Sequence, residues 1–233
     1  MRRILTLGVA ALCLAPLIAG ATDPGWSDAP VPQWSEEDAQ QFLKASPWVK
    51  TVHLDATRTL SRFERRDAGD FDIGIPTGMG IQLAGPEADW HAIAAAEHAW
   101  IVSQLPSVAV HWESAVPVRA AEQKVGVKPS DQLTDGYYAV AVHKIPTPGT
   151  WHLAAKLKNL ASIKRDGKKA LKPARVLIQM GDDGLATLVY LFKRTDEITK
   201  RDTKLAFAAQ VGRLYVSADF FPAEMRYQGQ LEL

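Results

Sequence analysis

The sequence predicts an α+β fold, with a few helices from the N-terminal half and an antiparallel β-meander in the C-terminal half. Alternating apolar and polar segments dominate the second half, where short turn sequences such as Asp166-Gly167 and "GDDG" at 181–184 separate them. Helix start and stop signals gather in the first half. We therefore expect one α+β domain over residues 35–233, after an exposed lead-in at residues 22–34 that is rich in Pro and Asp.

Helix signals are clearest in two short segments. Ser35 is a good N-cap for "EEDAQQFLK", and Asp38 three residues later resembles the capping-box pattern. In "PVRAAEQKVG", Pro117 stands at the start of a predicted helix and Gly126 stands just past its end. A further helical turn is expected within residues 151–160.

Strand signals come from apolar residues that recur with period two. "SVAVHWESA" places Val108, Val110, Trp112 and Ser114 on one face. "GYYAVAVHKI" is apolar on both faces, which predicts a central place in a sheet. "LAFAAQV" and "RLYVSADF" form a predicted hairpin around Gly212. Further strands are expected in "WVKTVHLDATRTL", "ASIKRDGKKAL", "ARVLIQM" and "LATLVYLF".

The C-terminal end also alternates. Met225, Tyr227, Gly229, Leu231 and Leu233 share one face, and the residues between them are polar or charged. This pattern predicts a last strand that ends inside the sheet, with the glycine marking a bulge or a close backbone approach.

The N-terminus resembles a secretory signal peptide. Arg2 and Arg3 precede an apolar run that Pro16 interrupts, and Ala19-Gly20-Ala21 provides the small residues of a cleavage site. A transmembrane anchor is the alternative, but the apolar run is short for a complete span. We expect residues 1–21 to be a cleaved signal peptide, which predicts an exported protein of the periplasm or the extracellular space.

Cleavage would change the charge and the cysteine content. It would remove two of the 27 basic residues, leaving 25 against 26 acidic residues, and it would remove Cys13, the only cysteine. The mature chain would then have no disulfide and no thiolate ligand. Acylation of Cys13 is disfavoured because Leu12 stands where a small residue is needed. No basic run marks a nucleic-acid partner, and no transmembrane segment is expected after cleavage.

The segment "DWHAIAAAEHAW", residues 89–100, superficially resembles a metalloprotease helix. His91 and His98 are seven residues apart, so on a straight helix they lie about 10.5 Å apart along the axis. Ligands from a zinc helix are four residues apart and converge on one ion. We therefore expect a packing helix between Pro86 and Pro106, with no metal and no cofactor.

Other catalytic patterns are missing as well. The sequence has no G-x-S-x-G elbow, and the glycine-rich stretch at residues 69–85 matches neither phosphate-binding pattern. No catalytic residue is assigned. Weak binding candidates are Trp112, Glu113 and Arg119, because a carboxylate beside a buried tryptophan needs a partner and Arg119 is the nearest cation in sequence. We expect the last two to lie close together and to serve structure.

Part of the chain resembles known sequences. The segment "WESA" at residues 112–115 with Pro117-Val118-Arg119, the segment "FKRTDEIT" and the strand "KLAFAAQVG" are similar to segments of uncharacterised exported bacterial proteins, as is the ending with Tyr227, Gly229 and Leu231. The resemblance covers about the last half of the chain. It implies that strand, short helix and meander form one unit, and it carries no activity with it.

Two function classes remain open. The favoured one is an exported, non-catalytic binding or structural module of the bacterial cell envelope, whose partner is an unknown envelope protein or polymer. The alternative is a hydrolase acting on an envelope polymer or sugar, because the two carboxylates of a glycosidase cannot be excluded by their sequence spacing. A cleft lined by two carboxylates, or by tryptophan and a carboxylate, would favour the hydrolase.

Overall fold

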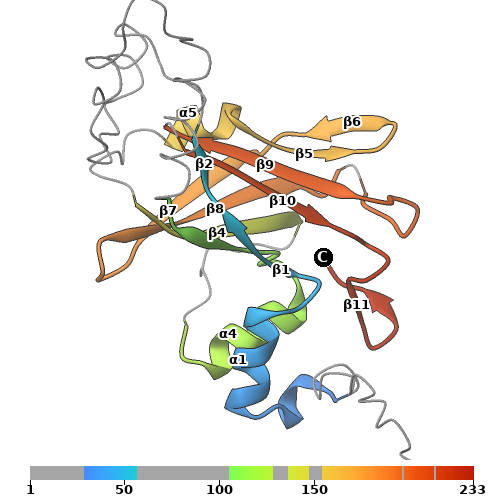
Figure 1. Cartoon of the computed structure of the whole chain (residues 1–233). Coiled ribbons are helices and arrows are strands. Elements are labelled where there is room, and N and C mark those ends of the chain that lie inside the picture. Colours follow the sequence, from blue (N-terminus) through green and yellow to red (C-terminus); the bar gives the residue numbers. More distant parts are fainter. Residues whose placement is uncertain (1–28, 57–104, 128–135, 147–153, 196, 213) are drawn as a thin grey trace, which may run out of the picture.

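A computed structural model describes residues 29–56, 105–127, 136–146, 154–195, 197–212 and 214–233. The expected signal peptide, the glycine-rich stretch at 69–85 and the helix with His91 and His98 lie outside these residues. The predicted α+β class is confirmed, with mostly antiparallel strands in the C-terminal half and few helices (Figure 1). Among the described residues, no helix is long and apolar enough to cross a membrane.

The described helices are η1 (Val31–Gln33), α1 (Glu36–Lys44), α4 (Val116–Lys124) and α5 (Ala154–Asn159). Sheet A has the strand order β1 (Val49–His53), β3 (Ser107–His111), β4 (Tyr137–Pro146), β8 (Leu185–Lys193) and β7 (Arg175–Met180). Sheet B has the order β2 (Asp55–Ala56), β10 (Leu214–Phe220), β9 (Leu205–Val211), β5 (Ala161–Arg165) and β6 (Lys168–Leu171). A separate hairpin pairs β11 (Arg226–Tyr227) with β12 (Gln230–Leu231). All strand pairs within the described ranges are antiparallel.

The chain passes from sheet A to sheet B between β1 and β2, at the fully buried Leu54. Most of the buried apolar residues of both sheets belong to one core cluster. Buried and less buried residues alternate strictly in β9 and β10. Leu205 and Phe207 of β9 therefore face the main core, as do Val216 and Phe220 of β10. The predicted hairpin around Gly212 is therefore confirmed.

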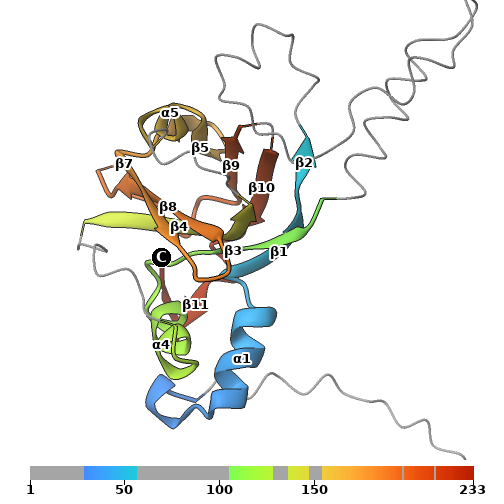
Figure 2. The same ribbon diagram turned by 90° about the vertical axis from the view of Figure 1, so that its left-hand side faces the viewer.

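Helices α1 and α4 pack side by side below the sheets (Figures 1 and 2). The predicted capping box of α1 is confirmed, because Ser35 Oγ accepts from the Asp38 backbone N–H and the Asp38 carboxylate accepts from the Ser35 N–H. Helix α4 begins with Pro117 in its first turn and is followed by Gly126 at φ +77°, which also agrees with prediction. Both helices expose one face and bury the other.

Strand β4 lies in the middle of sheet A, as its two apolar faces predict. Tyr138, Val140 and Val142 join the main core, whereas Ala139 and Ala141 belong to a smaller cluster on the outer face. The adjacent strand β3 shows the same division, because the predicted face with Val108, Val110 and Trp112 lies in the core. Residues of β3 and β4 with the opposite parity therefore face outward, away from the main core.

Two details correct the sequence-based picture. The C-terminal end is a small hairpin and not a strand of the main sheets. Gln228 and Gly229 both have positive φ, so Gly229 forms the turn and marks no bulge. The alternation in this segment was correct, but local turn chemistry reverses the chain halfway.

The second correction concerns the lead-in. Trp34, at the end of the segment expected to be exposed, is buried, and its ring lies 5.0 Å from that of Phe42. The Val31 backbone N–H donates to the Tyr227 hydroxyl at 2.7 Å. The end of the lead-in is therefore part of the core, because an indole in this position gains more from burial than from solvent contact.

Candidate functional site

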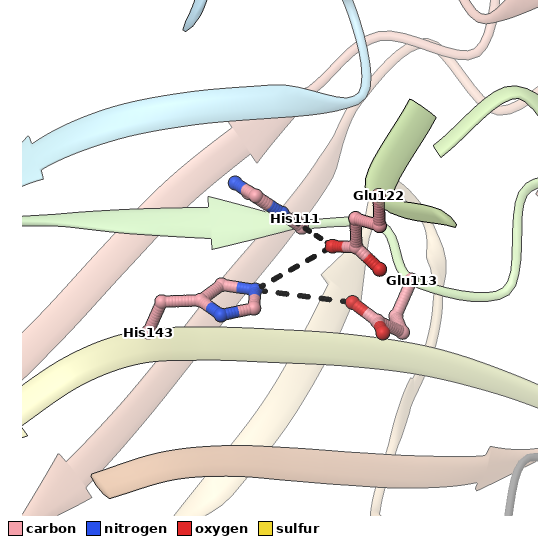
Figure 3. Close-up of side chains that lie close together, drawn as sticks. All are labelled: His111, Glu113, Glu122 and His143. Atoms are coloured by element: carbon pink, nitrogen blue, oxygen red, sulfur yellow. Dashed lines mark hydrogen bonds and ion pairs between the residues drawn. The ribbon is translucent and has the colours of Figure 1, made fainter. Parts of the chain in front are cut away.

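Four ionisable side chains meet on the outer face of sheet A, beneath α4 (Figure 3). His111 ends β3, Glu113 follows two residues later on the same face, Glu122 comes from α4, and His143 comes from β4. We call these four residues the His/Glu quartet. Each offers one nitrogen or oxygen, and these donor atoms all lie within 4.8 Å of one another.

The closest contact joins His111 Nδ1 to Glu122 Oε1 at 3.0 Å. His143 Nε2 lies 3.8 Å from Glu113 Oε2 and 4.0 Å from Glu122 Oε1. The imidazole rings of His111 and His143 are 4.2 Å apart between centroids. Because Ala141 pairs with His111 and has no side chain beyond Cβ, His143 can approach the other imidazole along the strand.

The position of His143 depends on a local irregularity of β4. The β4–β8 pairing changes register between Val142 and Ile145, and Lys144 has a φ of +59°. Such bulges redirect a side chain at the end of a regular ladder. On the other side of the ring, His143 Nδ1 lies 3.4 Å from Thr187 Oγ1. If Nδ1 carries the proton and donates it to Thr187, then Nε2 presents a lone pair to the two carboxylates.

Burial changes the acid–base properties of all four groups. Burial, followed by repulsion from the Glu122 carboxylate, raises the pKa of Glu113 to about 9. Burial also raises the pKa of Glu122 to about 7, against a lowering by its hydrogen bond with Glu113. The pKa of His111 falls to about 4 and that of His143 to about 3, both mainly because burial disfavours imidazolium.

The quartet contains many acceptor atoms and few donors. Glu113 Oε2, Glu122 Oε2 and His143 Nε2 are buried and have no hydrogen-bond partner among the described residues. Glu113 and Glu122 can hydrogen-bond to each other only when one of them is protonated, since two carboxylates are both acceptors. The site therefore holds at least one extra proton between its carboxyl groups, or it takes a cation in its place.

A second feature is a cavity of about 610 Å³ at the opposite end of β4. Three cationic side chains line it, namely Arg119 of α4, Arg194 and Lys200, together with Tyr137 and Tyr138. We call it the cationic cavity. Its remaining charged side chains are Glu197 and Glu232.

Arg194 is held in place by the cavity wall. Its Nε donates to the Tyr137 carbonyl at 3.1 Å, and another of its nitrogens donates to the Leu233 carbonyl. Its guanidinium lies 4.6 Å from the centroid of the Tyr138 ring. Arg194 and Lys200 are exposed and Arg119 is half-buried, but only Arg194 has hydrogen bonds to the described wall, so Arg119 and Lys200 are better placed to meet a ligand.

The three predicted binding candidates have different surroundings. Glu113 belongs to the quartet, and Arg119 lines the cavity. Trp112 is buried in the core with its ring 5.3 Å from that of Phe220, and it is part of neither site. Arg119 is close enough to lower the pKa of Glu113, although burial and Glu122 outweigh it. The structural coupling of Glu113 with Arg119 stays a prediction.

Sequence reasoning did not select His111, Glu122 or His143. A usable signal existed in "HWE", which places a histidine and a glutamate on one face of a strand at period two. Nothing in the sequence placed Glu122 or His143 beside them, because strand pairing and helix packing create that proximity.

No protein-family model, curated protein or solved structure matches this chain. The resemblance of its second half to uncharacterised exported bacterial proteins therefore stays an expectation. The features of this chain that bear on its function are therefore the quartet and the cationic cavity.

Proposed function

We propose that this protein is an exported, non-catalytic binding module of the bacterial cell envelope, and that its cavity binds an acidic group of an envelope polymer or of another envelope ligand. The observation that carries this proposal is the cationic cavity. Its volume of about 610 Å³ lies within the usual range of roughly 300–1,000 Å³ for ligand sites. Cationic side chains outnumber acidic ones in its wall, and two tyrosines provide apolar surface beside them.

The cavity matches a carboxylate or phosphate better than a neutral sugar. Arg119 offers a planar guanidinium that can bind a carboxylate through two parallel hydrogen bonds, and the exposed Lys200 adds a second positive charge to the lining. Arg194 is already bonded to the protein, so it contributes a fixed positive field more than a new contact.

A hydrolase is the second candidate, favoured by Glu197 and Glu232 in the same cavity. A glycosidase needs one carboxylic acid whose surroundings keep it protonated and one carboxylate that stays ionised. The buried pair Glu113 and Glu122 has such raised pKa values, but neither residue lines the cavity. The residues suited to acid–base chemistry are thus not those that meet a ligand there, which is why we favour binding without catalysis.

Binding should depend on Arg119. We expect soluble peptidoglycan fragments that carry free carboxylates to bind saturably in calorimetry, and Arg119→Ala to weaken this binding about tenfold or more. Lys164→Ala, which removes an exposed lysine from β5 outside the cavity, is the matched control and should bind like the unmodified protein. Equal binding of fragments with amidated carboxylates would contradict the proposal. Cleavage of the fragments that is lost in Glu197→Gln would support the hydrolase.

Export makes a prediction of its own. Protein isolated from the envelope fraction should have the intact mass of a chain beginning at Thr22, because Ala19-Gly20-Ala21 follows the apolar run. Mass spectrometry measures this directly. A mass that retains residues 1–21, or that includes a lipid on Cys13, would contradict the signal-peptide assignment.

A further inference from the structure

We propose that the His/Glu quartet binds one divalent transition-metal ion of the zinc class, with His111, Glu113, Glu122 and His143 as ligands. This site is separate from the cationic cavity and does not depend on the proposed function. It also departs from the expectation that the chain binds no metal, which rested on His91, His98 and the lack of cysteine. Those two histidines are not among the residues that the fold brings together here.

The spacing of the donor atoms agrees with a tetrahedral site. Zinc bonds to nitrogen and oxygen are about 2.0–2.2 Å long, so two ligand atoms of one tetrahedron are about 3.4 Å apart. The contacts of the quartet are 3.0, 3.8 and 4.0 Å, and no pair of its donor atoms exceeds 4.8 Å. Small side-chain rotations are therefore enough to bring all four atoms around one ion.

The charge of the quartet requires a partner. Two ionised carboxylates and two neutral imidazoles carry a charge of about −2, and the side chains of Glu113 and Glu122 are only 5% and 2% exposed. A buried charge of this size is costly unless it is compensated. A divalent cation would make the site neutral, and it would satisfy Glu113 Oε2 and His143 Nε2 at once, while Glu122 binds it through Oε1.

The ligand types indicate the class of metal. Two imidazole nitrogens with two carboxylate oxygens favour zinc and neighbouring transition metals, whereas calcium and magnesium prefer oxygen alone. Four protein ligands leave no coordination position for a substrate, which is typical of a structural site. Because Glu122 belongs to α4 and the other three residues to β3, its extension and β4, the ion would fasten α4 to sheet A (Figure 3).

Thr187 is the neighbour that would orient one ligand. Histidine ligands usually donate their second N–H to a protein oxygen, which fixes the tautomer. Thr187 Oγ1, 3.4 Å from His143 Nδ1, is placed to accept that proton. On His111 the contact of Nδ1 with Glu122 would change on metal binding, since the Nδ1 lone pair would then face the ion.

Binding is tested with Zn²⁺ and Co²⁺ as probes on untagged full-length protein that has been stripped with a chelator. We expect calorimetry to give one ion per chain, and the Co²⁺ complex to show the strong visible absorption of tetrahedral coordination. A thousandfold excess of Zn²⁺ over its Kd should raise the melting temperature by about 10 °C. A chain that binds no ion, or that gives a weak octahedral Co²⁺ spectrum, would overturn the proposal.

Variants locate the site. His143→Gln and Glu122→Gln should each weaken Zn²⁺ binding by about 100-fold or more, and Thr187→Val by about tenfold. His53→Gln and Glu224→Gln are the matched controls, because both residues are exposed and lie outside the quartet. Circular dichroism of the stripped variants verifies that they fold. If His143→Gln does not fold, the nearly isosteric Glu122→Gln is the variant in which Zn²⁺ binding is measured. Unchanged binding in Glu122→Gln, or an equal loss in His53→Gln, would show that the ion binds elsewhere.

Discussion

Deletion of residues 227–233 should yield insoluble protein, or protein that melts far below the full-length chain. Leu233 is buried in the main core, and Tyr227 and Leu231 pack against that core. Burial of one large apolar side chain contributes roughly 1.5–3 kcal/mol, and the total stability of a domain is only about 5–15 kcal/mol. Loss of one buried and two partly buried side chains therefore removes a sizeable part of this total.

The same deletion also leaves a donor of the buried Trp48 and one of the partly buried Val31 without partners. Trp48 Nε1 donates to the Glu232 carbonyl at 2.8 Å, and the Val31 N–H donates to the Tyr227 hydroxyl at 2.7 Å. An unsatisfied buried donor costs about 1–3 kcal/mol. Gln230→Ala is the control in the same hairpin, because Gln230 is exposed and its loss should change stability by less than about 0.5 kcal/mol. A truncated chain that melts within a degree or two of the full-length chain would contradict this account.

The stability of the metal-free protein should fall as the pH rises from about 6.5 to 9. Folding raises the pKa of Glu113 to about 9 and that of Glu122 to about 7, chiefly through burial. In this range the folded quartet holds a proton that the unfolded chain, with ordinary glutamate pKa values, has lost. Since stability decreases with pH wherever the native state binds more protons, we expect a loss of about 2 kcal/mol between pH 6.5 and 8.5.

The histidines act in the opposite direction at lower pH. Burial lowers the pKa of His111 to about 4 and that of His143 to about 3, so below pH 6.5 the unfolded chain binds protons that the folded chain does not. Between about pH 5 and 6 these effects nearly cancel, so the contribution of the quartet to stability should be greatest at roughly pH 5.5. Arg119 favours ionised Glu113, and Lys144 disfavours imidazolium at His143, but both effects are smaller than burial.

Urea denaturation in the presence of a chelator measures this pH profile. Glu113→Gln cannot ionise, so most of the loss above pH 7 should disappear in this variant. Glu224→Gln, which changes an exposed glutamate outside the quartet, should keep the unmodified profile. A flat profile between pH 6.5 and 9 in the unmodified protein would show that the carboxyl groups of the quartet are not proton-bound. An unchanged slope in Glu113→Gln would assign the effect to other groups.

Local patterns of the sequence were sufficient to predict most of the described helices and strands. The capping box at Ser35, the start of α4 near Pro117 and the turns at Gly167 and Gly212 depend on neighbouring residues only, and the structure confirms them. The central place of β4 also followed from its composition. The C-terminal hairpin was predicted as one continuous strand. The alternation of apolar and polar residues continues across its two-residue turn, so the pattern alone does not reveal the turn.

The sequence by itself determined the periodicity of the strands, the caps of the helices and the α+β class, because these depend on interactions within a few residues. Only the tertiary structure decided that His143, 32 positions beyond His111, lies beside it, and that α4 turns Glu122 toward both. Antiparallel pairing of β3 with β4 sets the first proximity, and the packing of α4 below the sheets, with Val118 and Ala121 in the main core, sets the second. Burial then follows from that packing, and burial is what shifts the pKa values and leaves acceptor atoms without partners. Residue spacing along the chain cannot encode such a site, because its donor atoms converge only after the sheet has formed and α4 has packed next to it.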